Sequence, residues 1–154
     1  MSGNSLTGHV TWQGRPAQPD PLQQLPITLT LRSGAPDFNY PVQNTDNRGF
    51  FTVTTNIPAG AYNWRVKGPK FLANAGSMTL AAGSNPVEMG LMLTGDANND
   101  NIVSAVDYTT LRVSFGKGIG DPGYDDRADF NGDNRVNTVD FTLLKTNFGR
   151  GGAP

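Results

Sequence analysis

Two twelve-residue segments repeat the same spacing of oxygen-bearing side chains. Residues 96–107 read DANNDNIVSAVD and residues 129–140 read DFNGDNRVNTVD, and the similarity continues beyond both segments at the same offset of 33 residues. A hard cation such as Ca²⁺ takes roughly six to eight oxygen ligands, and a twelve-residue loop supplies them from alternating positions as the chain coils around the ion. The spacing therefore predicts two calcium ions, one in each loop.

The predicted ligands occupy positions 1, 3, 5, 7, 9 and 12 of each loop, with a backbone carbonyl at position 7. In the first loop (96–107) they are Asp96, Asn98, Asp100, Ile102, Ser104 and Asp107. In the second loop (129–140) they are Asp129, Asn131, Asp133, Arg135, Asn137 and Asp140. The usual EF-hand has Gly at position 6 and Glu at position 12. Asn101 and Asn134 replace that Gly here, and Asn tolerates the left-handed turn.

A helix is predicted after each loop. Ser104 and Asp107 have the spacing of a capping box, Asn137 is the corresponding cap in the second copy, and Gly116 and Gly149 are placed to end the helices. We expect Val103 and Val136, at position 8, to bridge the two loops back to back. The predicted apolar stripes are Val106, Leu111 and Phe115 in the first helix, and Val139, Leu143, Leu144 and Phe148 in the second.

The residues before the loops show strand periodicity instead. Short runs rich in Val, Ile, Thr, Phe and Tyr alternate apolar with polar residues, and turn-forming residues separate them. About seven strands of this kind predict a β-sandwich. We therefore predict two domains, an all-β sandwich over residues 1–94 and a small α module of two calcium-binding loop-helix repeats over residues 95–154. The predicted strands are 6–12, 27–32, 38–43, 50–55, 61–67, 77–81 and 86–93.

Composition argues against several classes of function. The 154 residues carry 12 Lys and Arg against 13 Asp and Glu, a formal net charge of −1 that would not attract nucleic acid or an anionic membrane. The absence of Cys excludes disulfides and thiolate zinc sites, and a single histidine, His9, excludes a multi-histidine metal centre. Since no acid, base and nucleophile converge in the sequence, we predict that the chain is not an enzyme. It shows neither a membrane span nor a signal peptide, so we expect a cytosolic chain or a piece of a longer exported protein.

The duplicated loop and helix, without an entering helix, resemble the dockerin family, specifically its type I-like members. The resemblance covers about 60 residues and includes GDANNDNIVSAVDYTTLR and DFNGDNRVNTVDFTLLK. It implies a calcium-dependent module that binds a cohesin domain and attaches an extracellular parent protein to a scaffold. The residues that it implies for partner contact are Ala105, Val106, Arg112, Thr138, Val139 and Lys145. Many dockerins carry a Ser-Thr-like pair where this chain has Ala-Val and Thr-Val.

TDNRGFFTV at residues 45–53 and NIPAGAYNWRVK at residues 56–67 resemble carboxypeptidase regulatory-like and Cna-B-like sandwiches. The Lys–Asn isopeptide bond of some members of that superfamily is not expected, because the first strand contains no Lys and Glu88 is the single Glu of the chain. Almost no linker separates Leu93 from Asp96, so we expect the sandwich to pack on the module.

A carbohydrate-binding module with structural calcium is the alternative function. In that case Trp12, Trp64 and Tyr62 would form an exposed platform for a polysaccharide, although aromatic residues of this kind are more often core residues. The glycine-rich end, residues 149–154, is expected to be a frayed tail or the natural C-terminus, where dockerins often sit.

Overall fold

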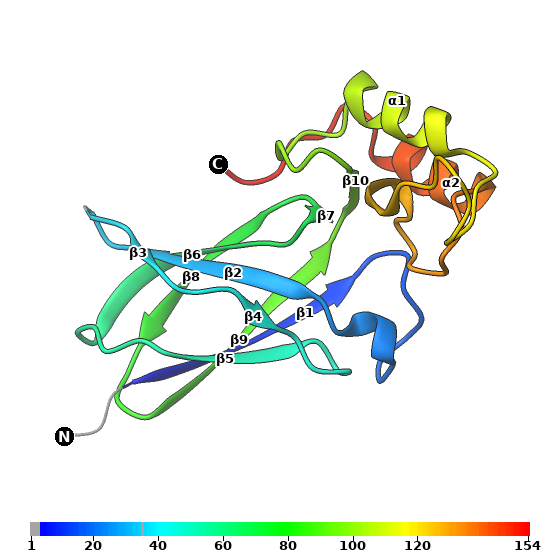
Figure 1. The fold of residues 1–154 in the computed structure, drawn as a ribbon. Helices are drawn as coiled ribbons and strands as arrows, with labels where there is room; N and C mark the ends of the chain where they lie inside the picture. The colour runs from blue at the N-terminus through cyan, green and yellow to red at the C-terminus, as the bar shows by residue number, and fades with distance from the viewer. Residues whose placement is uncertain (1–3, 35) are drawn as a thin grey trace.

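Every second side chain of β1 (Ser5–Trp12) is buried, as the alternation in the sequence predicts. The computed structural model describes residues 4–34 and 36–154, and the same pattern returns in β2 (Pro26–Arg32), β5 (Phe50–Thr54) and β6 (Gly60–Lys67). β1 pairs antiparallel with β5 on one side and parallel with β9 (Ser84–Met92) on the other. These three strands form one sheet of the sandwich (Figure 1).

The second sheet has the order β3-β2-β6-β8, with β3 at Phe38–Asn39 and β8 at Asn74–Leu80. β4 (Gln43–Asn44) also pairs with β2. The inward-facing side chains of both sheets form one hydrophobic core that includes Leu6, Leu31 and Val66. The predicted β-sandwich is thus confirmed, and it is followed by a C-terminal part with two helices.

The strands differ from the prediction mainly in three places. The predicted strand 38–43 is two short pieces, β3 and β4, because Pro41 between them has no N–H to donate to a ladder. β8 begins three residues before the predicted Ser77. β7 (Lys70–Phe71) and β10 (Thr94–Asp96) pair antiparallel with each other and were not predicted. The predicted domain boundary at residues 94–95 falls within β10.

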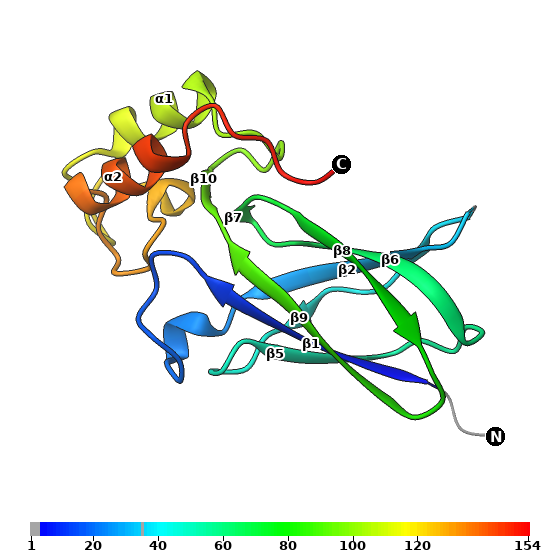
Figure 2. The same ribbon diagram turned by 180° about the vertical axis from the view of Figure 1, so that it is seen from behind.

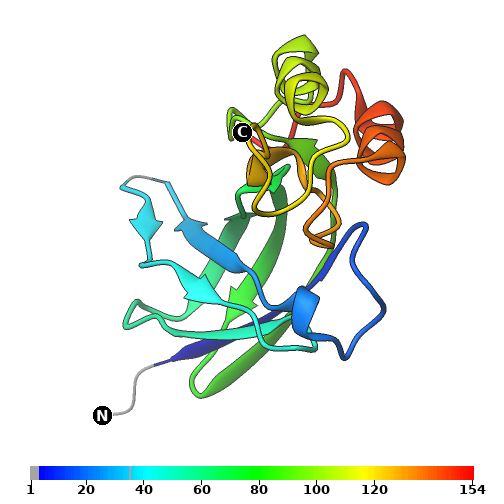
Figure 3. The same ribbon diagram turned by 45° about the vertical axis from the view of Figure 1, so that its right-hand side comes forward.

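The C-terminal module (residues 95–154) lies at the end of the sandwich where β1 and β9 finish, away from the N-terminus (Figure 2). It contains α1 (Ala105–Ser114), a single turn η2 (Asp126–Ala128) and α2 (Thr138–Asn147). A further single turn, η1 (Pro21–Gln23), follows β1 in the sandwich. Viewed nearly end-on, α1 and α2 lie side by side above the sandwich (Figure 3). At ten residues each, neither helix could span a bilayer, and no other helix in the described part of the chain could either.

Two neighbouring residues connect the two hydrophobic cores. Phe71 of β7 is fully buried in the sandwich core, where its ring packs edge-on against Trp12 with ring centroids 4.6 Å apart. The next residue, Leu72, belongs to the module core together with Val103, Leu111 and Leu144. Because successive side chains of an extended chain point to opposite sides, this short segment contributes to both cores.

The aromatic residues considered for sugar binding are core residues. Trp12 is 1% exposed, Trp64 is 6% exposed and Tyr62 is 7% exposed. The indole N–H of Trp12 donates to Thr45 Oγ1 at 3.1 Å. The interpretation as core residues is therefore confirmed and the alternative of an exposed platform made of these three residues is not, because alternation places all three on the inward face of their strands.

Candidate functional site

The first loop brings three aspartates together. One carboxylate oxygen from each of Asp96, Asp100 and Asp107 lies within 4.8 Å of the other two. Asp96 accepts the backbone N–H groups of Asp100 at 3.0 Å and Asn101 at 2.8 Å, so the chain curls around this carboxylate. Asn101 has a φ of 67°, which is the left-handed turn expected at position 6.

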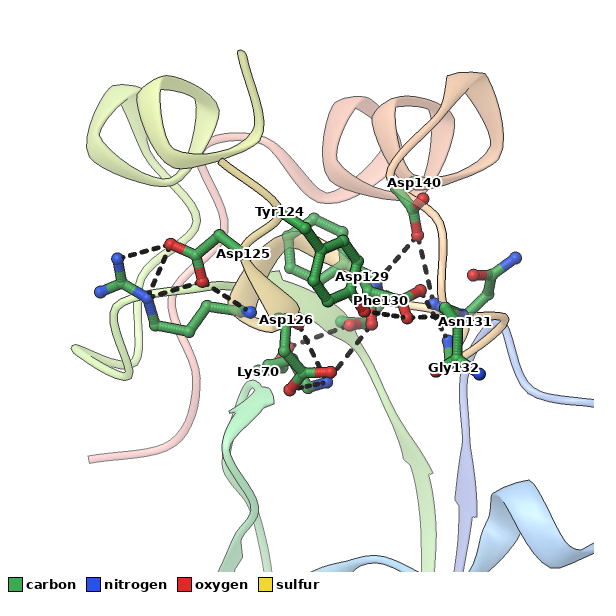
Figure 4. Close-up of polar contacts among 12 residues, drawn as sticks. Lys70, Tyr124, Asp125, Asp126, Asp129, Phe130, Asn131, Gly132 and Asp140 are labelled. Carbon is green, nitrogen blue, oxygen red and sulfur yellow. Dashed lines mark hydrogen bonds and ion pairs between the residues drawn. The ribbon is translucent and has the colours of Figure 1, made fainter. Parts of the chain in front are cut away.

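The second loop repeats this arrangement with Asp129, Asp133 and Asp140, again with carboxylate oxygens within 4.8 Å of one another. Asp129 accepts the N–H of Asn134, the residue equivalent to Asn101, at 2.9 Å. Figure 4 shows Asp140 projecting from the start of α2 toward the backbone of the loop, where it accepts N–H groups that include that of Phe130 at 2.8 Å. The two loops therefore share one internal design.

The other predicted ligands lie on the same loops but have varied partners. Asn98 Nδ2 donates to Asp100 Oδ2 at 3.2 Å, which places that amide beside the aspartates. Asn137 differs, because its Oδ1 accepts the N–H of Val139 at 3.1 Å and so caps α2. The remaining predicted residues contribute backbone N–H groups to the aspartates of their own loops: Ile102 to Asp100, Ser104 to Asp107, Asn131 to Asp140, and Arg135 to Asp133.

Burial makes the negative charge of these loops costly without a cation. Asp96, Asp107 and Asp140 are fully buried and Asp129 is 1% exposed. Burial raises the pKa of Asp96 and of Asp129, and it raises the pKa of Asp140 to about 6. Buried carboxylates in proteins are normally paired with a cation or bound to a metal. The donor set, carboxylate and amide oxygens on a tightly curled loop, fits a hard divalent cation.

Basic groups of the sandwich neutralise only part of this charge. Lys67 Nζ lies 3.1 Å from Asp96 Oδ2 and also bonds to Asn99 Oδ1, but the first loop carries three carboxylates. In the second loop, Lys70 Nζ reaches the backbone oxygen of Asp129 at 3.3 Å and pairs with Asp126 (Figure 4). The carboxylate of Asp129 instead accepts the hydroxyl of Tyr124 at 3.0 Å.

The residues around the loops were not predicted from the sequence. Besides the two lysines, Arg15 donates through Nε to the backbone oxygen of Phe130, at position 2 of the second loop, at 3.2 Å. Lys67, Lys70 and Arg15 lie in segments of the sandwich that are far from the loops in sequence, so spacing could not reveal them. The excess of aspartate after residue 94 was the available signal that nearby cations would come from the sandwich.

Each loop pairs with the segment that follows the helix of the other repeat. The backbone N–H of Val136 donates to Lys117 O at 2.9 Å, and the backbone N–H of Gly116 donates to Val136 O at 2.7 Å. In the other copy, the backbone N–H of Val103 donates to Arg150 O at 2.9 Å, and the backbone N–H of Gly149 donates to Val103 O at 2.8 Å. The expected bridge between Val103 and Val136 is therefore not made by their backbones, although both side chains belong to the same hydrophobic cluster. Both valines are fully buried, and the pairing is reciprocal between the two repeats.

Several apolar residues that were predicted in the helix stripes lie on the exposed faces of the helices and not in the core. Leu111 and Leu144 are buried, as expected for core stripes. Other stripe residues are exposed: Val106 at 55%, Val139 at 50%, Phe115 at 47% and Phe148 at 53%. Val106 and Val139 lie in the first turn of their helices, and Phe115 and Phe148 are the C-cap residues. All six residues expected to contact a partner are exposed: Ala105, Val106, Arg112, Thr138, Val139 and Lys145.

A hollow of about 470 Å³ lies beside α1 and α2. It is lined by Tyr108, Leu111, Arg112, Phe115 and Phe141. Tyr108 of α1 and Phe141 of α2 are equivalent residues of the two repeats, and their rings meet edge-on with centroids 6.2 Å apart. The helices therefore offer a partly apolar surface with exposed cations at Arg112 and Lys145.

Comparison with known proteins supports this picture of the module. Residues 94–149 match the family of the dockerin type I domain. Two crystal structures of mutants of a type II cohesin-X-dockerin complex from Acetivibrio cellulolyticus contain a chain with a similar fold. The TM-scores are 0.74 and 0.70, each at 17% identity, covering 97% of this chain and 98% of that chain. No curated protein matches the sequence.

Proposed function

We propose that this chain is a non-catalytic, calcium-dependent docking unit that binds a cohesin domain and attaches an extracellular parent protein to a scaffold. The observation that carries the proposal is the pair of three-aspartate loops, in each of which two aspartates are buried and one is exposed, each leading into a helix with an exposed partner face. The match of residues 94–149 to the dockerin type I domain and the likeness to a chain of a cohesin-X-dockerin complex support it.

In this proposal each loop holds one calcium ion. The ligands would be the aspartates at positions 1, 5 and 12, the asparagine at position 3 and the backbone carbonyl at position 7, with Ser104 or Asn137 at position 9. Because Asn137 Oδ1 caps α2, we expect position 9 to act there through water, as is common in loops of this type. Calcium would supply the positive charge that the buried carboxylates lack.

The two repeats would give the partner two docking orientations. Their equivalent residues, Val106 with Val139 and Arg112 with Lys145, are exposed on helices whose loops pair reciprocally, which is the arrangement expected for two repeats related by an approximate twofold axis. A cohesin turned by about half a revolution would meet nearly the same side chains. The substitution of Thr-Val for Ala-Val makes the two faces similar rather than identical.

Binding assays test the proposal directly. Immobilised cohesin domains of type I and type II, probed by biolayer interferometry, should capture the chain in calcium and release it in EDTA. The double variant Arg112→Ala/Lys145→Ala should bind at least about tenfold more weakly. Arginine is enriched among the interface residues whose truncation costs more than about 1 kcal/mol of binding free energy, and Lys145 is the equivalent of Arg112 in the second repeat. Each single variant should lose less, because the other repeat can replace it. Arg48→Ala, on the sandwich, is the matched control. Capture that persists unchanged in EDTA, or a double variant that binds like the wild type, would contradict the proposal.

The alternative of a carbohydrate-binding module has lost its structural basis. The three aromatic residues on which it depended are buried in the sandwich core. We therefore assign the sandwich to the support of the docking module, through the contacts of Lys67, Lys70 and Arg15 with the loops.

A further inference from the structure

The end of the chain is bonded along its length to the first loop and to the sandwich. The C-terminal segment (residues 149–154) was expected to be frayed, but Gly152 N–H donates to Asn101 O at 2.9 Å and Ala153 N–H donates to Ala73 O at 3.0 Å. The next contacts come from arginines of the sandwich. Arg65 Nε donates to Ala153 O at 3.1 Å, and Arg32 Nη1 donates to Pro154 O at 3.0 Å. Figure 2 shows this segment running from α2 across the junction with the sandwich.

Asn101 lies at the centre of these contacts. Its Oδ1 accepts the N–H of Ala73 in the sandwich at 2.8 Å, and its Nδ2 donates to Ala153 O in the C-terminal segment at 2.9 Å. Its own N–H donates to Asp96 at 2.8 Å, so the same residue positions the first aspartate of the loop. Asn101 therefore joins the sandwich, the C-terminal segment and the first loop.

Within residues 4–34 and 36–154, the second loop has no equivalent clamp. There the residue equivalent to Gly152 is Ile119, whose N–H donates to Asn134 O at 2.8 Å, but both Ile119 and Asn134 are exposed to solvent. The first aspartate of that loop is held by Tyr124, a residue of the module itself. The contacts of Arg15 and Lys70 with the second loop reach backbone oxygens at positions 1 and 2, at the entry of the loop.

We propose that the C-terminal segment and Asn101 clamp the first loop onto the sandwich, so that the calcium affinity of the first loop depends on this docking and that of the second loop does not. The proposal rests on the proposed function, because it requires that both loops bind calcium. Groups that orient a metal ligand from outside typically contribute about 10-fold to 100-fold in metal affinity. Coupling is reciprocal, so calcium in the first loop strengthens the docking of the C-terminal segment by the same factor.

Two neighbouring glycines provide a matched pair of variants. A Cβ on Gly152 would overlap Asn101 Oδ1 and would lie 2.5 Å from the backbone nitrogen of Ala73, so Gly152→Ala must push the segment away. A Cβ on Gly151 would meet its nearest atoms, Asn101 O and Ile102 Cγ1, at 3.8 Å and 3.9 Å, which is ordinary contact. Gly151→Ala therefore adds the same methyl group at the next residue without breaking the clamp.

Calcium titration with site-resolved detection measures the effect. The amide signals of residues 101 and 134 report the two loops separately by NMR, because each amide donates to the first aspartate of its own loop. Gly152→Ala should weaken calcium binding in the first loop by about tenfold and leave the second loop within about twofold. Gly151→Ala should change neither. Docking is followed independently by trypsin cleavage after Arg150, which should be faster in Gly152→Ala and, in the wild type, faster in EDTA.

A second variant tests the clamp in case the C-terminal segment stays in place in Gly152→Ala. Asn101→Gly removes both side-chain bonds of the clamp and keeps a residue that accepts the left-handed turn. It should weaken the first loop as Gly152→Ala does. If both loops weaken equally, or if cleavage accelerates while the affinity of the first loop is unchanged, the inference is overturned. It is also overturned if neither variant accelerates cleavage. A wild-type chain that binds no calcium would instead refute the proposed function.

Discussion

Removal of calcium should unfold the C-terminal module well before the sandwich. Without a cation, the buried carboxylates of Asp96 and Asp107 lie within 4.8 Å of each other, and at an effective dielectric constant of about 20 their repulsion is about 3 kcal/mol. Mass action gives a similar scale, about 2.7 kcal/mol for each site when calcium is present at about 100 times its dissociation constant. For two sites the expected loss of unfolding free energy is therefore about 5 kcal/mol.

The size of the resulting shift in Tm shows how far the two parts unfold together. For a module of about 60 residues that unfolds alone, about 5 kcal/mol corresponds to a fall of roughly 20 to 40 °C. If the whole chain unfolds as one unit, the same free energy corresponds to roughly 10 to 20 °C. The contacts of Leu72, Lys67 and Asn101 across the junction predict that chelation also lowers the Tm of the sandwich, by a smaller amount.

Two spectroscopic probes separate the parts. Both α-helices lie in the module, so circular dichroism at 222 nm follows it, while Trp12 and Trp64 lie in the sandwich core, so their fluorescence follows the sandwich. Melting curves would be recorded in calcium and in EDTA at equal ionic strength, with magnesium as the control cation. Equal melting of the helical signal in calcium and in EDTA would refute the reasoning.

Three further predictions concern single side chains. Leu144→Ala removes a buried side chain of the module core and should cost about 2 to 5 kcal/mol in urea denaturation followed by circular dichroism, whereas Val113→Ala, on the exposed face of α1, should stay within about 0.5 kcal/mol. In EDTA the chain should be about 1 kcal/mol more stable at pH 5 than at pH 7, because the pKa of Asp140 is raised to about 6 in the folded state and the folded chain binds the extra proton; Asp140→Asn should abolish this contribution, and equal pH dependence in both proteins would contradict it. Trp12→Phe removes the hydrogen bond to Thr45 and should cost about 1 to 2 kcal/mol, measured by the fluorescence of the remaining tryptophan; an unchanged midpoint would contradict the assigned role of this bond.

The features that depend on local spacing were accessible from the sequence. The three aspartates of each loop come together because the chain between them is short and a left-handed residue at position 6 turns it back. Gly116 and Gly149 end the helices with φ values of 83° and 86° for the same local reason. Alternation also identified the longer strands, including β1 and β6, because half-buried strands impose it on the sequence.

Features that depend on contacts between distant residues were missed. β7 has two residues and exists because β10 lies beside it, so it has no periodicity of its own. The C-terminal segment contains little but glycine, alanine and proline, yet its backbone groups bond to the backbone of Asn101 and Ala73 and to the side chain of Asn101. Lys67 and Arg15 looked like ordinary surface cations because nothing in their neighbourhood in sequence indicates that they reach the loops.

The adjacent residues Phe71 and Leu72 have a practical consequence for anyone who wishes to graft this unit onto another protein. Cutting the chain between the strands and the loops would expose the apolar side chain of Leu72 on one product. It would leave a cavity in the hydrophobic core of the other product. The portable piece is therefore the entire chain, and a fusion that carries residues 95–154 alone should be prone to aggregate.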